Sequence, residues 1–430
     1  MVEVENKVQR YDMYKESGVE WLGEIPEHWT VGRLGSILNP VSSKNHPNET
    51  LLSITREKGV IVRDLENEDE NHNYIPDDLT GYKLLKEGQF GMNKMKAWQG
   101  SYGVSSYTGI VSPAYYTFEF TKNIEPRFFH LAIRSKMYVS FFGKASDGVR
   151  IGQWDLSKDR MKRIPLAIPP LSEQTKIAQF LDDKTTKIED AIAIKVKQIN
   201  LLKERKQILI HKAVTRGLDD SLTLKDSGVE WIGEIPKGWL SISFRRISHL
   251  QQGLQIAIDK RLEEPTDDAL EYITTKSIHN PNNPKHYVTK PNENVICDYQ
   301  DVLLGRTGNT GEVVTNVRGV FHNNFFKIVY DKKRIERDFL VNYLKTQGIQ
   351  KLIMLSAGVT TIPDLNHGDF LSLPFVLPPL SEQKEISAYI ETASQKIETA
   401  IGLKQQEIEK LKEYKSSLIN GVVTGKVKVC

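Results

Sequence analysis

The chain repeats itself over a long period. Residues 15–26 read KESGVEWLGEIP and residues 225–236 read KDSGVEWIGEIP, so only two conservative changes separate the copies. A second motif, PPLSEQ, stands at 169–174 and again at 378–383. The copies lie 210 and 209 residues apart, whereas solenoids and propellers have repeats of roughly 20 to 50 residues. The sequence therefore predicts a pseudo-two-fold tandem duplication of one large unit.

A long helix is expected after each PPLSEQ motif. Two prolines block helix entry upstream, Ser172 and Ser381 suit the N-cap, and the glutamate after each serine suits the first-turn dipole. We expect a break or bend at 182–186, DDKTT. Beyond it, matching heptad positions hold the same residue types: Ile188, Lys195, Leu202, Leu209, Ile192, Ile199 and Lys206 in one copy, Ile397, Lys404, Leu411, Leu418, Ile401, Ile408 and Lys415 in the other. Two matched seams favour an antiparallel coiled coil within the chain over helices that pack only on their own domains.

The two stretches between the shared motifs, 27–168 and 237–377, have few identities but the same order of features. Each has a strand-like run, a polar glycine-containing stretch, a second strand-like run and a helix-like segment, at 125–142 or 336–355. A Gly-Val step, an Asp-Leu pair and an apolar-Pro step follow. We predict an α+β fold with two β-rich domains that contain helices and are joined by the two long helices. The expected segments are 1–26, 27–168, 169–218, 219–236, 237–377 and 378–430.

Composition limits the partners only weakly. The 58 Lys and Arg residues against 55 Asp and Glu give a charge of +3, which neither demands nor excludes a polyanion. Cys297 and Cys430 lack companions at metal-ligand spacing, which fits a reducing compartment. No signal peptide and no run of about 20 apolar residues is present, so we expect a cytoplasmic protein without membrane contact.

The sequence contains no pattern that indicates catalysis. GVVTGK at 421–426 is one residue short of a phosphate-binding loop and fits a helix-terminating tail. Leucine follows Pro169-Pro170 and Pro378-Pro379, where an adenine methyltransferase would need an aromatic residue to stack the flipped base. Glu204 and Lys206 are spaced like a nuclease pair, but they lie on the heptad helix with no aspartate placed to share a metal. We expect no catalytic residue, metal or cofactor in this chain.

The polar stretches carry donors suited to base edges. Arg and Lys pair with guanine, Asn and Gln pair with adenine, and glycine lets the backbone approach a groove. A polar loop of this kind is by itself typical of a plain hairpin, and Trp98 could stack on DNA or anchor its loop. Arg150, Thr360 and Thr361 stand at or next to the Gly-Val steps. The candidate DNA-binding residues are Asn93, Lys94, Lys96, Trp98, Gln99, Arg150, Arg306, Thr307, Asn309, Thr310, Thr360 and Thr361.

Two divergent segments, each opened by GVEWxGEIP and followed by PPLSEQ and a long helix, resemble the specificity subunit of Type I restriction-modification systems over essentially the whole chain. The resemblance implies a non-catalytic subunit whose two target-recognition domains, 27–168 and 237–377, read an asymmetric bipartite target in double-stranded DNA. It also implies that the long helices are spacers.

The same resemblance implies partners. Two methyltransferase subunits would bring S-adenosylmethionine for adenine N6 methylation, and restriction subunits would bring ATP and Mg. The residues implied to dock the methyltransferase subunits are Leu171, Ser172, Glu173, Gln174, Leu380, Ser381, Glu382 and Gln383.

Two other functions remain open from the sequence. A toxin-like or anti-phage DNA-binding protein that acts alone would bind a specific site tightly without a partner. A pure scaffold that holds two enzymes with its helix pair would show no sequence-selective DNA binding. Neighbouring genes for a methyltransferase and a helicase-nuclease would discriminate among the three.

Overall fold

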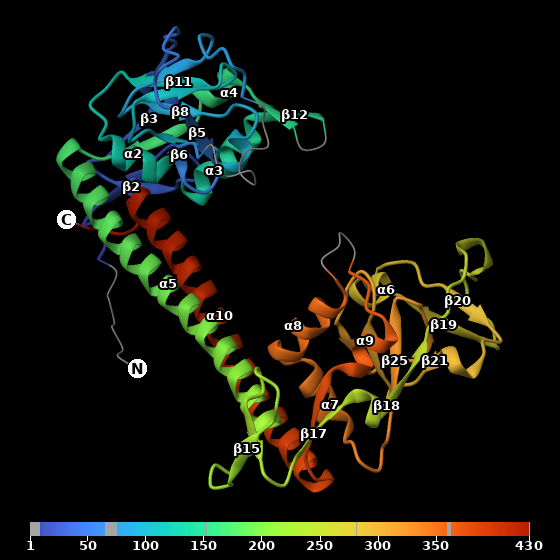
Figure 1. Cartoon of the computed structure of the whole chain (residues 1–430). Coiled ribbons are helices and arrows are strands. Elements are labelled where there is room, and N and C mark those ends of the chain that lie inside the picture. Colours follow the sequence, from blue (N-terminus) through green and yellow to red (C-terminus); the bar gives the residue numbers. More distant parts are fainter. Residues whose placement is uncertain (1–8, 65–74, 151–152, 281, 359–362, 430) are drawn as a thin grey trace. The chain divides into compact units, whose positions relative to one another are not determined.

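The computed structural model describes residues 9–64, 75–150, 153–280, 282–358 and 363–429. The chain divides into two compact units: unit 1 comprises Met1–Lys195 with Gln405–Cys430, and unit 2 comprises Val196–Lys404. Each unit contains one variable segment and parts of both long helices, α5 and α10 (Figure 1).

Unit 1 is built on an antiparallel four-stranded sheet in the order β4-β11-β8-β9. Helices α2 and α3 follow β11 in the chain. The elements of its variable segment are β3 (Thr30–Arg33), α1 (Leu34–Ile37), β4 (Leu38–Val41), β5 (Leu52–Thr55), β6 (Gly59–Val62), β7 (Lys83–Leu85), β8 (Phe90–Met92), β9 (Tyr102–Val104), β10 (Gly109–Val111), β11 (Tyr116–Phe120), α2 (Pro126–Ile133), α3 (Lys136–Lys144), β12 (Ser146–Arg150), β13 (Gln153–Leu156), α4 (Lys158–Lys162) and β14 (Pro165–Ile168).

Unit 2 repeats this plan with the sheet order β18-β25-β22-β23 and adds a second sheet, β20-β19-β24-β21. The same strand order in both units, with helices after β11 and β25, confirms the predicted α+β class. The elements are β17 (Leu240–Ser243), β18 (Ser248–Gln252), β19 (Ala269–Ile273), α6 (Thr275–His279), β20 (Tyr287–Thr289), β21 (Ile296–Cys297), β22 (Val302–Gly305), β23 (Val313–Val314), β24 (Gly319–Phe321), β25 (Phe325–Tyr330), α7 (Arg337–Leu344), α8 (Gln347–Ser356), α9 (His367–Ser372) and β26 (Pro374–Leu377).

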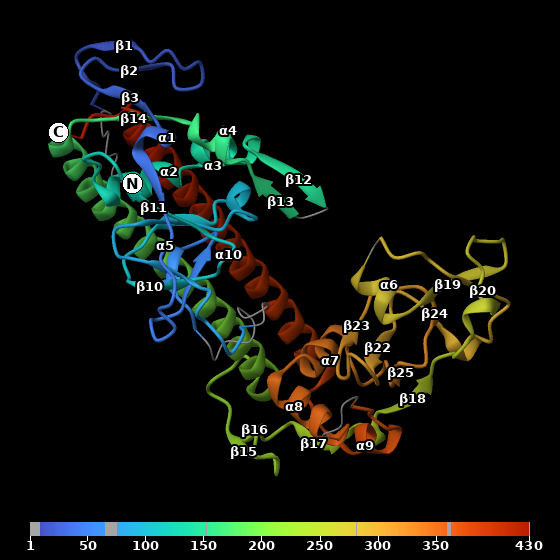
Figure 2. The same cartoon turned by 90° about the horizontal axis from the view of Figure 1, so that it is seen from above.

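The repeated GVEWxGEIP motif forms a β-hairpin in each unit. Strands β1 (Tyr14–Glu16) and β2 (Glu24–Pro26) pair in unit 1, as do β15 (Leu224–Asp226) and β16 (Glu234–Pro236) in unit 2. The tryptophan of each motif packs on the variable segment of its own unit, with Trp21 on Tyr138 and Trp231 on Tyr343. Figure 2 shows the β1–β2 hairpin from above.

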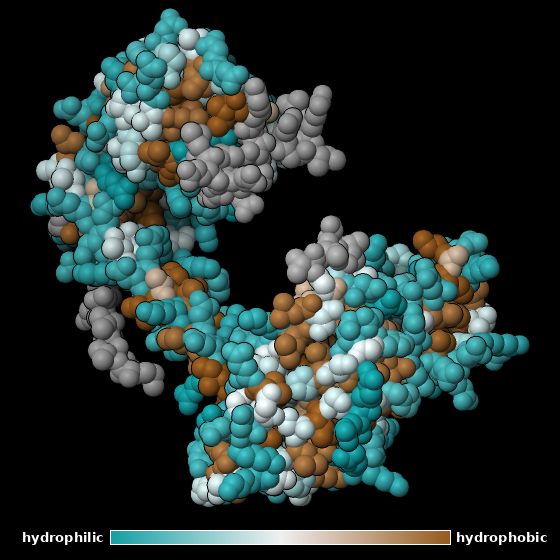
Figure 3. All heavy atoms as spheres, viewed as in Figure 1, coloured by the Kyte–Doolittle hydropathy of each residue, from teal (hydrophilic) through white to brown (hydrophobic). Residues whose placement is uncertain are grey.

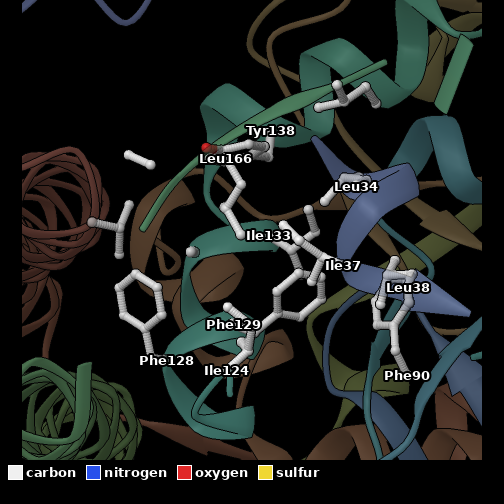
Figure 4. Close-up of a cluster of buried hydrophobic side chains, with 14 of the residues drawn as sticks. Leu34, Ile37, Leu38, Phe90, Ile124, Phe128, Phe129, Ile133, Tyr138 and Leu166 are labelled. Atoms are coloured by element: carbon white, nitrogen blue, oxygen red, sulfur yellow. The ribbon is translucent and has the colours of Figure 1, made fainter. Parts of the chain in front are cut away.

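Each variable segment begins and ends on one pair of strands. Strand β3 pairs with β14 in unit 1, and β17 pairs with β26 in unit 2. Because entry and exit are hydrogen-bonded to each other, the segment between them closes on itself as a module. The hydrophobic core of the first module fills the space between the sheet and helices α2 and α3. Figure 4 shows part of it, including the buried Leu34, Phe90 and Phe129.

The single helix-like segment expected at 125–142 and at 336–355 is wrong in both units. Each consists of two short helices, α2 and α3 or α7 and α8. The break falls at Ser135 and at Thr346, whose backbones are extended, with ψ of 150° and 146°. At the second break, Thr346 Oγ1 bonds the carbonyl of Tyr343 at 2.8 Å, a contact by which a threonine hydroxyl competes with helix hydrogen bonding.

The two long helices are continuous. Helix α5 runs over Leu171–Arg216 and α10 over Leu380–Val423, so the expected break at 182–186 is wrong. The serine N-caps are also wrong, because the carbonyls of Pro170 and Pro379 already accept the first helical hydrogen bonds, from Gln174 N and Gln383 N. Ser172 and Ser381 therefore lie inside the first turn.

The helices pair in antiparallel fashion, as the heptads predict, and the seam lysines contribute to the pairing. In unit 1, Lys195 contacts Glu407 at 2.5 Å and Lys415 contacts Glu189. In unit 2, Lys206 contacts Glu398 at 2.9 Å. Such charge pairs beside an apolar seam set register and direction more than they add stability.

Each long helix is followed by a glycine that lies against a tryptophan. Gly217 and Gly425 have φ of 77° and 74°, and a side chain at either would meet Trp239 or Trp29. Glycine is favoured at such a helix end because this backbone conformation strains other residues. The expectation that 421–426 terminates a helix is confirmed, since Lys426 N and Val427 N bond back to the carbonyl of Gly421.

His130 should make unit 1 sensitive to acid. Its ring lies against β9, where Nδ1 accepts a hydrogen bond from Val104 N at 3.2 Å. Burial, and then the charges of Arg134 and Arg127, lower the pKa of His130 from 6.5 to about 4. The unfolded chain therefore binds this proton first, and the free energy of unfolding should fall by up to about 3 kcal/mol between about pH 6.5 and about pH 4.

Denaturant titrations of the wild type and of His130→Asn at about pH 7 and about pH 4.5 measure this contribution. Asparagine can accept the same hydrogen bond through Oδ1 but does not titrate. The wild type should lose more stability on acidification than the variant, and equal losses would contradict the prediction.

Candidate nucleic-acid interface

The polar loop of unit 1 leaves β8 and is held from within by Asn93. This residue is only 7% exposed; its Nδ2 donates to Tyr115 Oη at 3.2 Å and its Oδ1 accepts from Met95 N at 3.2 Å. Asn93 therefore shapes the loop through its amide, and its role as a base-reading donor stays a prediction. Gly100 ends the loop at a φ of 93°.

The other candidates of this loop point to different environments. Lys96 is exposed, and Lys94 Nζ lies 3.3 Å from Asp155 Oδ1. The ring of Trp98 stacks on that of Trp154 in β13 with centroids 5.5 Å apart, so Trp98 anchors the loop to the β12–β13 hairpin. Trp154 is itself 37% exposed. Gln99 is half-buried at the end of the loop.

Four lysines from separate parts of the sequence gather beside this loop. Lys83 donates to Tyr115 O at 2.6 Å, and burial lowers its pKa, with further contributions from the charges of Lys158, Lys44 and Lys94. Lys158 Nζ also lies 4.4 Å from the centre of the Tyr116 ring. Like charges repel, so their collection at one place is typical of a surface that meets a polyanion. No sequence motif marks Lys44, Lys83 and Lys158, so they are not among the residues predicted to bind DNA.

The corresponding loop of unit 2 is fastened to the segment before α9. Arg306 donates to both carboxylate oxygens of Asp364, from Nε at 2.8 Å and Nη2 at 3.0 Å, and Thr307 Oγ1 donates to Asp364 at 2.6 Å. Thr310 Oγ1 lies 2.9 Å from the carbonyls of Arg306 and Pro363. These hydrogen bonds hold the loop, and the base contacts expected of the three residues stay a prediction that would require some of these bonds to be exchanged.

Asn309 is the exposed candidate of the unit 2 loop. Its Nδ2 lies 3.1 Å from His279 Nε2 and 3.2 Å from Glu312 Oε2. Of the remaining candidates, Thr360 and Thr361 lie outside the described residues. The structure describes the backbone of Arg150 in β12 but not its side chain.

Strand register shows that the two loops hold equivalent positions. Met92 lies opposite Tyr116 and Leu304 opposite Phe326, so Lys94 and Arg306 each stand two residues beyond matching strand positions. Each pairs with the aspartate of its repeated Asp-Leu step. The frame is therefore shared, while the residues displayed on it differ.

Four of the eight expected docking residues have internal partners. The carboxylate of Glu173 accepts hydrogen bonds from Tyr11 Oη and from Trp29 Nε1 at 3.2 Å, and Glu382 accepts from Trp239 Nε1 at 2.8 Å. Gln174 and Gln383 are buried, and their Oε1 atoms accept from Glu125 N and Glu336 N, both at 2.8 Å. Leu171, Ser172 and Ser381 are exposed and Leu380 is half-buried, so these remain candidates for docking.

The Glu-Gln pair thus joins each long helix to its own unit. Glu125 and Glu336, whose backbone N–H groups it binds, in turn cap α2 and α7 through their side chains. Trp29 and Trp239 stand at equivalent positions of the two halves, as do Glu173 and Glu382. This recurrence is the sequence signal for the tryptophan–glutamate contact.

Neither a metal cluster nor a membrane-spanning helix is found where the chain is described. Among these residues no three His, Cys, Asp or Glu side chains gather to hold a metal ion. No helix within the same ranges is both long and apolar enough to cross a membrane.

Comparison with known proteins identifies the family to which this chain belongs. The family model of the Type I restriction modification DNA specificity domain matches residues 26–198 and 237–412. The chain therefore belongs to this family, the DNA-recognising specificity subunits of Type I restriction-modification systems.

Relatives of similar length support the assignment. The Type I restriction enzyme MjaVIII specificity subunit of Methanocaldococcus jannaschii is 22% identical over 94% of this chain and 94% of its own. The StySPI specificity subunit of Salmonella potsdam is 23% identical over 88% and 86%.

Two solved structures have the same fold. A chain of a type I R-M system, solved to explain complex assembly and conformational transition, superposes with a TM-score of 0.71 at 15% identity, covering 93% of this chain and 98% of that one. The HsdS subunit from Thermoanaerobacter tengcongensis has a TM-score of 0.56 at 15% identity, with 94% and 98% covered.

Proposed function

We propose that this chain reads an asymmetric, two-part DNA target, with each unit recognising one half, and that it is not itself catalytic. The observation that carries the proposal is the equivalence of the two loops. Lys94 and Arg306 stand at matching positions on sheets of the same order, whereas the residues around them differ. One frame that presents two different sets of side chains is suited to two different half-sites.

Base reading in this proposal falls to side chains that remain available. In unit 1 these are Lys96, Gln99 and the partly exposed Trp154, next to the lysine cluster that would hold the DNA backbone. In unit 2 the exposed candidate is Asn309, whose Nδ2 would exchange its contacts with His279 and Glu312 for a base edge. Sequence selectivity comes from base edges, while lysine contacts to phosphates add affinity without selectivity.

We further propose that two methyltransferase subunits dock along the long helices and methylate adenine N6 with S-adenosylmethionine. Restriction subunits that use ATP and Mg would join the full complex. Exposed apolar residues recur at equivalent helix positions 209 residues apart: Ile194 is 57% exposed and Leu403 is 55% exposed. Figure 3 shows hydrophobic side chains at the surface of the helical segment. Such repeated apolar positions suit two like partners.

Exchange of one module tests the two-half proposal. Residues 237–377 begin and end on the β17–β26 pair, so a graft into a relative at these points keeps the module closed. The hybrid, with its methyltransferase partner, should methylate sites in which one half is new and the other unchanged. Sequencing of methylated sites gives the readout, and a simultaneous change in both halves would contradict the proposal. The purified chain without a partner is the control and should transfer no methyl group.

A further inference from the structure

A basic pocket of about 450 Å³ lies within unit 1, and none of the four clustered lysines lines it. It is formed by the end of the polar loop, the start of α3 and the last turns of α10. Gln99 and Gly100 line one side. The charged residues of its lining are Arg56, Glu57, Arg134, Lys136, Lys412 and Lys415. Arg56, Lys412 and Lys415 each pair with a glutamate, so the excess positive charge of the pocket comes from Arg134 and Lys136.

The pocket also contains hydrogen-bond donors that the fold does not use. Ser135 lines it and is 5% exposed, yet its hydroxyl has no partner within the described ranges. This serine is the N-cap of the nine-residue helix α3, but its side chain makes no capping hydrogen bond. The first N–H groups of a helix are unsatisfied by the helix itself and carry partial positive charge. A buried donor of this kind calls for an acceptor from outside the chain.

The cations of the pocket differ in how they are engaged. Arg134 donates to the carbonyls of Gly100, Tyr102, Arg56 and Glu57 at 2.6 to 3.1 Å, so it fixes the wall and supplies charge but offers few free donors. Lys412 and Lys415 each contact a glutamate. Lys136 has no acidic partner among the described residues, so it is the lysine left to bind a ligand.

We infer that this pocket binds a phosphate group, and we assign that group to the backbone of the DNA that the unit 1 loop recognises. Phosphate offers several anionic acceptor oxygens, which match the Ser135 hydroxyl, the α3 N-terminus and the Lys136 ammonium. The assignment to DNA rests on the proposed function and on Gln99 and Gly100, which belong both to the recognition loop and to the pocket wall. A phosphate held here fixes the register of the duplex on the loop.

Two variants of the full-length chain test the site on a duplex of random sequence. Lys136→Ala should weaken binding roughly tenfold at low salt and lower the slope of log affinity against log salt by about 0.9. Ser135→Asp supplies a good N-cap, so it should keep or raise the melting temperature while its charge weakens DNA binding. If Ser135 had only a structural role, a variant that keeps the melting temperature should also keep its affinity for DNA. Lys122→Ala, which removes an exposed lysine outside the pocket, is the control and should retain most of the affinity.

A second arm separates the source of the phosphate. Inorganic phosphate is added to the wild type and to Lys136→Ala, and thermal stability is measured. If phosphate stabilises only the wild type while both variants bind DNA normally, the pocket holds a free phosphate and the assignment to DNA is overturned. If the variants change neither response, the site itself is overturned. A wild-type chain that binds no DNA would count against the proposed function, and the phosphate arm would still decide the pocket.

Discussion

Replacement of Gln383 by leucine should lower the free energy of unfolding of unit 2 by about 3 to 5 kcal/mol. Gln383 is fully buried; its Oε1 accepts from Glu336 N, and its Nε2 donates to the carbonyls of Arg334 and Pro378 at 2.8 and 2.9 Å. Leucine is similar in size but leaves these three backbone groups without their partner. Each buried group left unsatisfied costs about 1 to 3 kcal/mol, part of which relaxation recovers.

Differential scanning calorimetry of the full chain provides the measurement, with a drop in melting temperature of about 10 °C expected for the unit 2 transition. Gln174→Leu should shift the unit 1 transition in the same way, because Gln174 makes matching bonds to Glu125 N and Pro169 O. Gln198→Leu, on the exposed surface of α5, is the control and should change little. A Gln383→Leu protein that melts like this control would show that the amide does not hold α10 to its unit.

Removal of either Arg306 or Asp364 should weaken DNA binding by about 1 to 3 kcal/mol, and the double variant should be no weaker than the single ones. The two residues form one bidentate ion pair that fastens the loop of unit 2. Once one partner is absent the loop is already loosened, so loss of the other adds little. Because the effect acts through loop order, single-base variants of the target should be affected alike.

Fluorescence anisotropy of the chain with its methyltransferase partner, on the methylated site and its single-base variants, gives these values. If Arg306 instead contacts a guanine, the expected result differs. Asp364→Ala would then free the guanidinium, and the preference for guanine at one position of the target would be kept or strengthened. Lys332→Ala, an exposed charge removal in the same unit, is the control for nonspecific electrostatics. Selectivity lost at a single position in Arg306→Ala alone would overturn the loop-holding role.

Binding residues were harder to predict than elements, because their direction is set by partners distant in sequence. Asn93 is turned inward by Tyr115, 22 residues further on, and Arg306 is engaged by Asp364, 58 residues further on. One usable signal was present: each half repeats an Asp-Leu step, and its aspartate is opposite in charge to the loop residue, Lys94 or Arg306, that it meets. Repeated acidic and basic positions of this kind indicate a structural pair more readily than a contact with DNA.

The sequence by itself determined the duplication, the α+β class and the antiparallel helix pair. These follow from local rules, since identical motifs form identical hairpins and heptads place apolar residues and lysines on one helix face. Tertiary structure decided which polar residues are exposed. It turned the Glu-Gln pair of each PPLSEQ motif into an internal fastening and brought Lys44, Lys83 and Lys158 together. The physical reason is that hydrogen bonding and charge clustering depend on distances in space, and for these residues only the folded chain sets those distances.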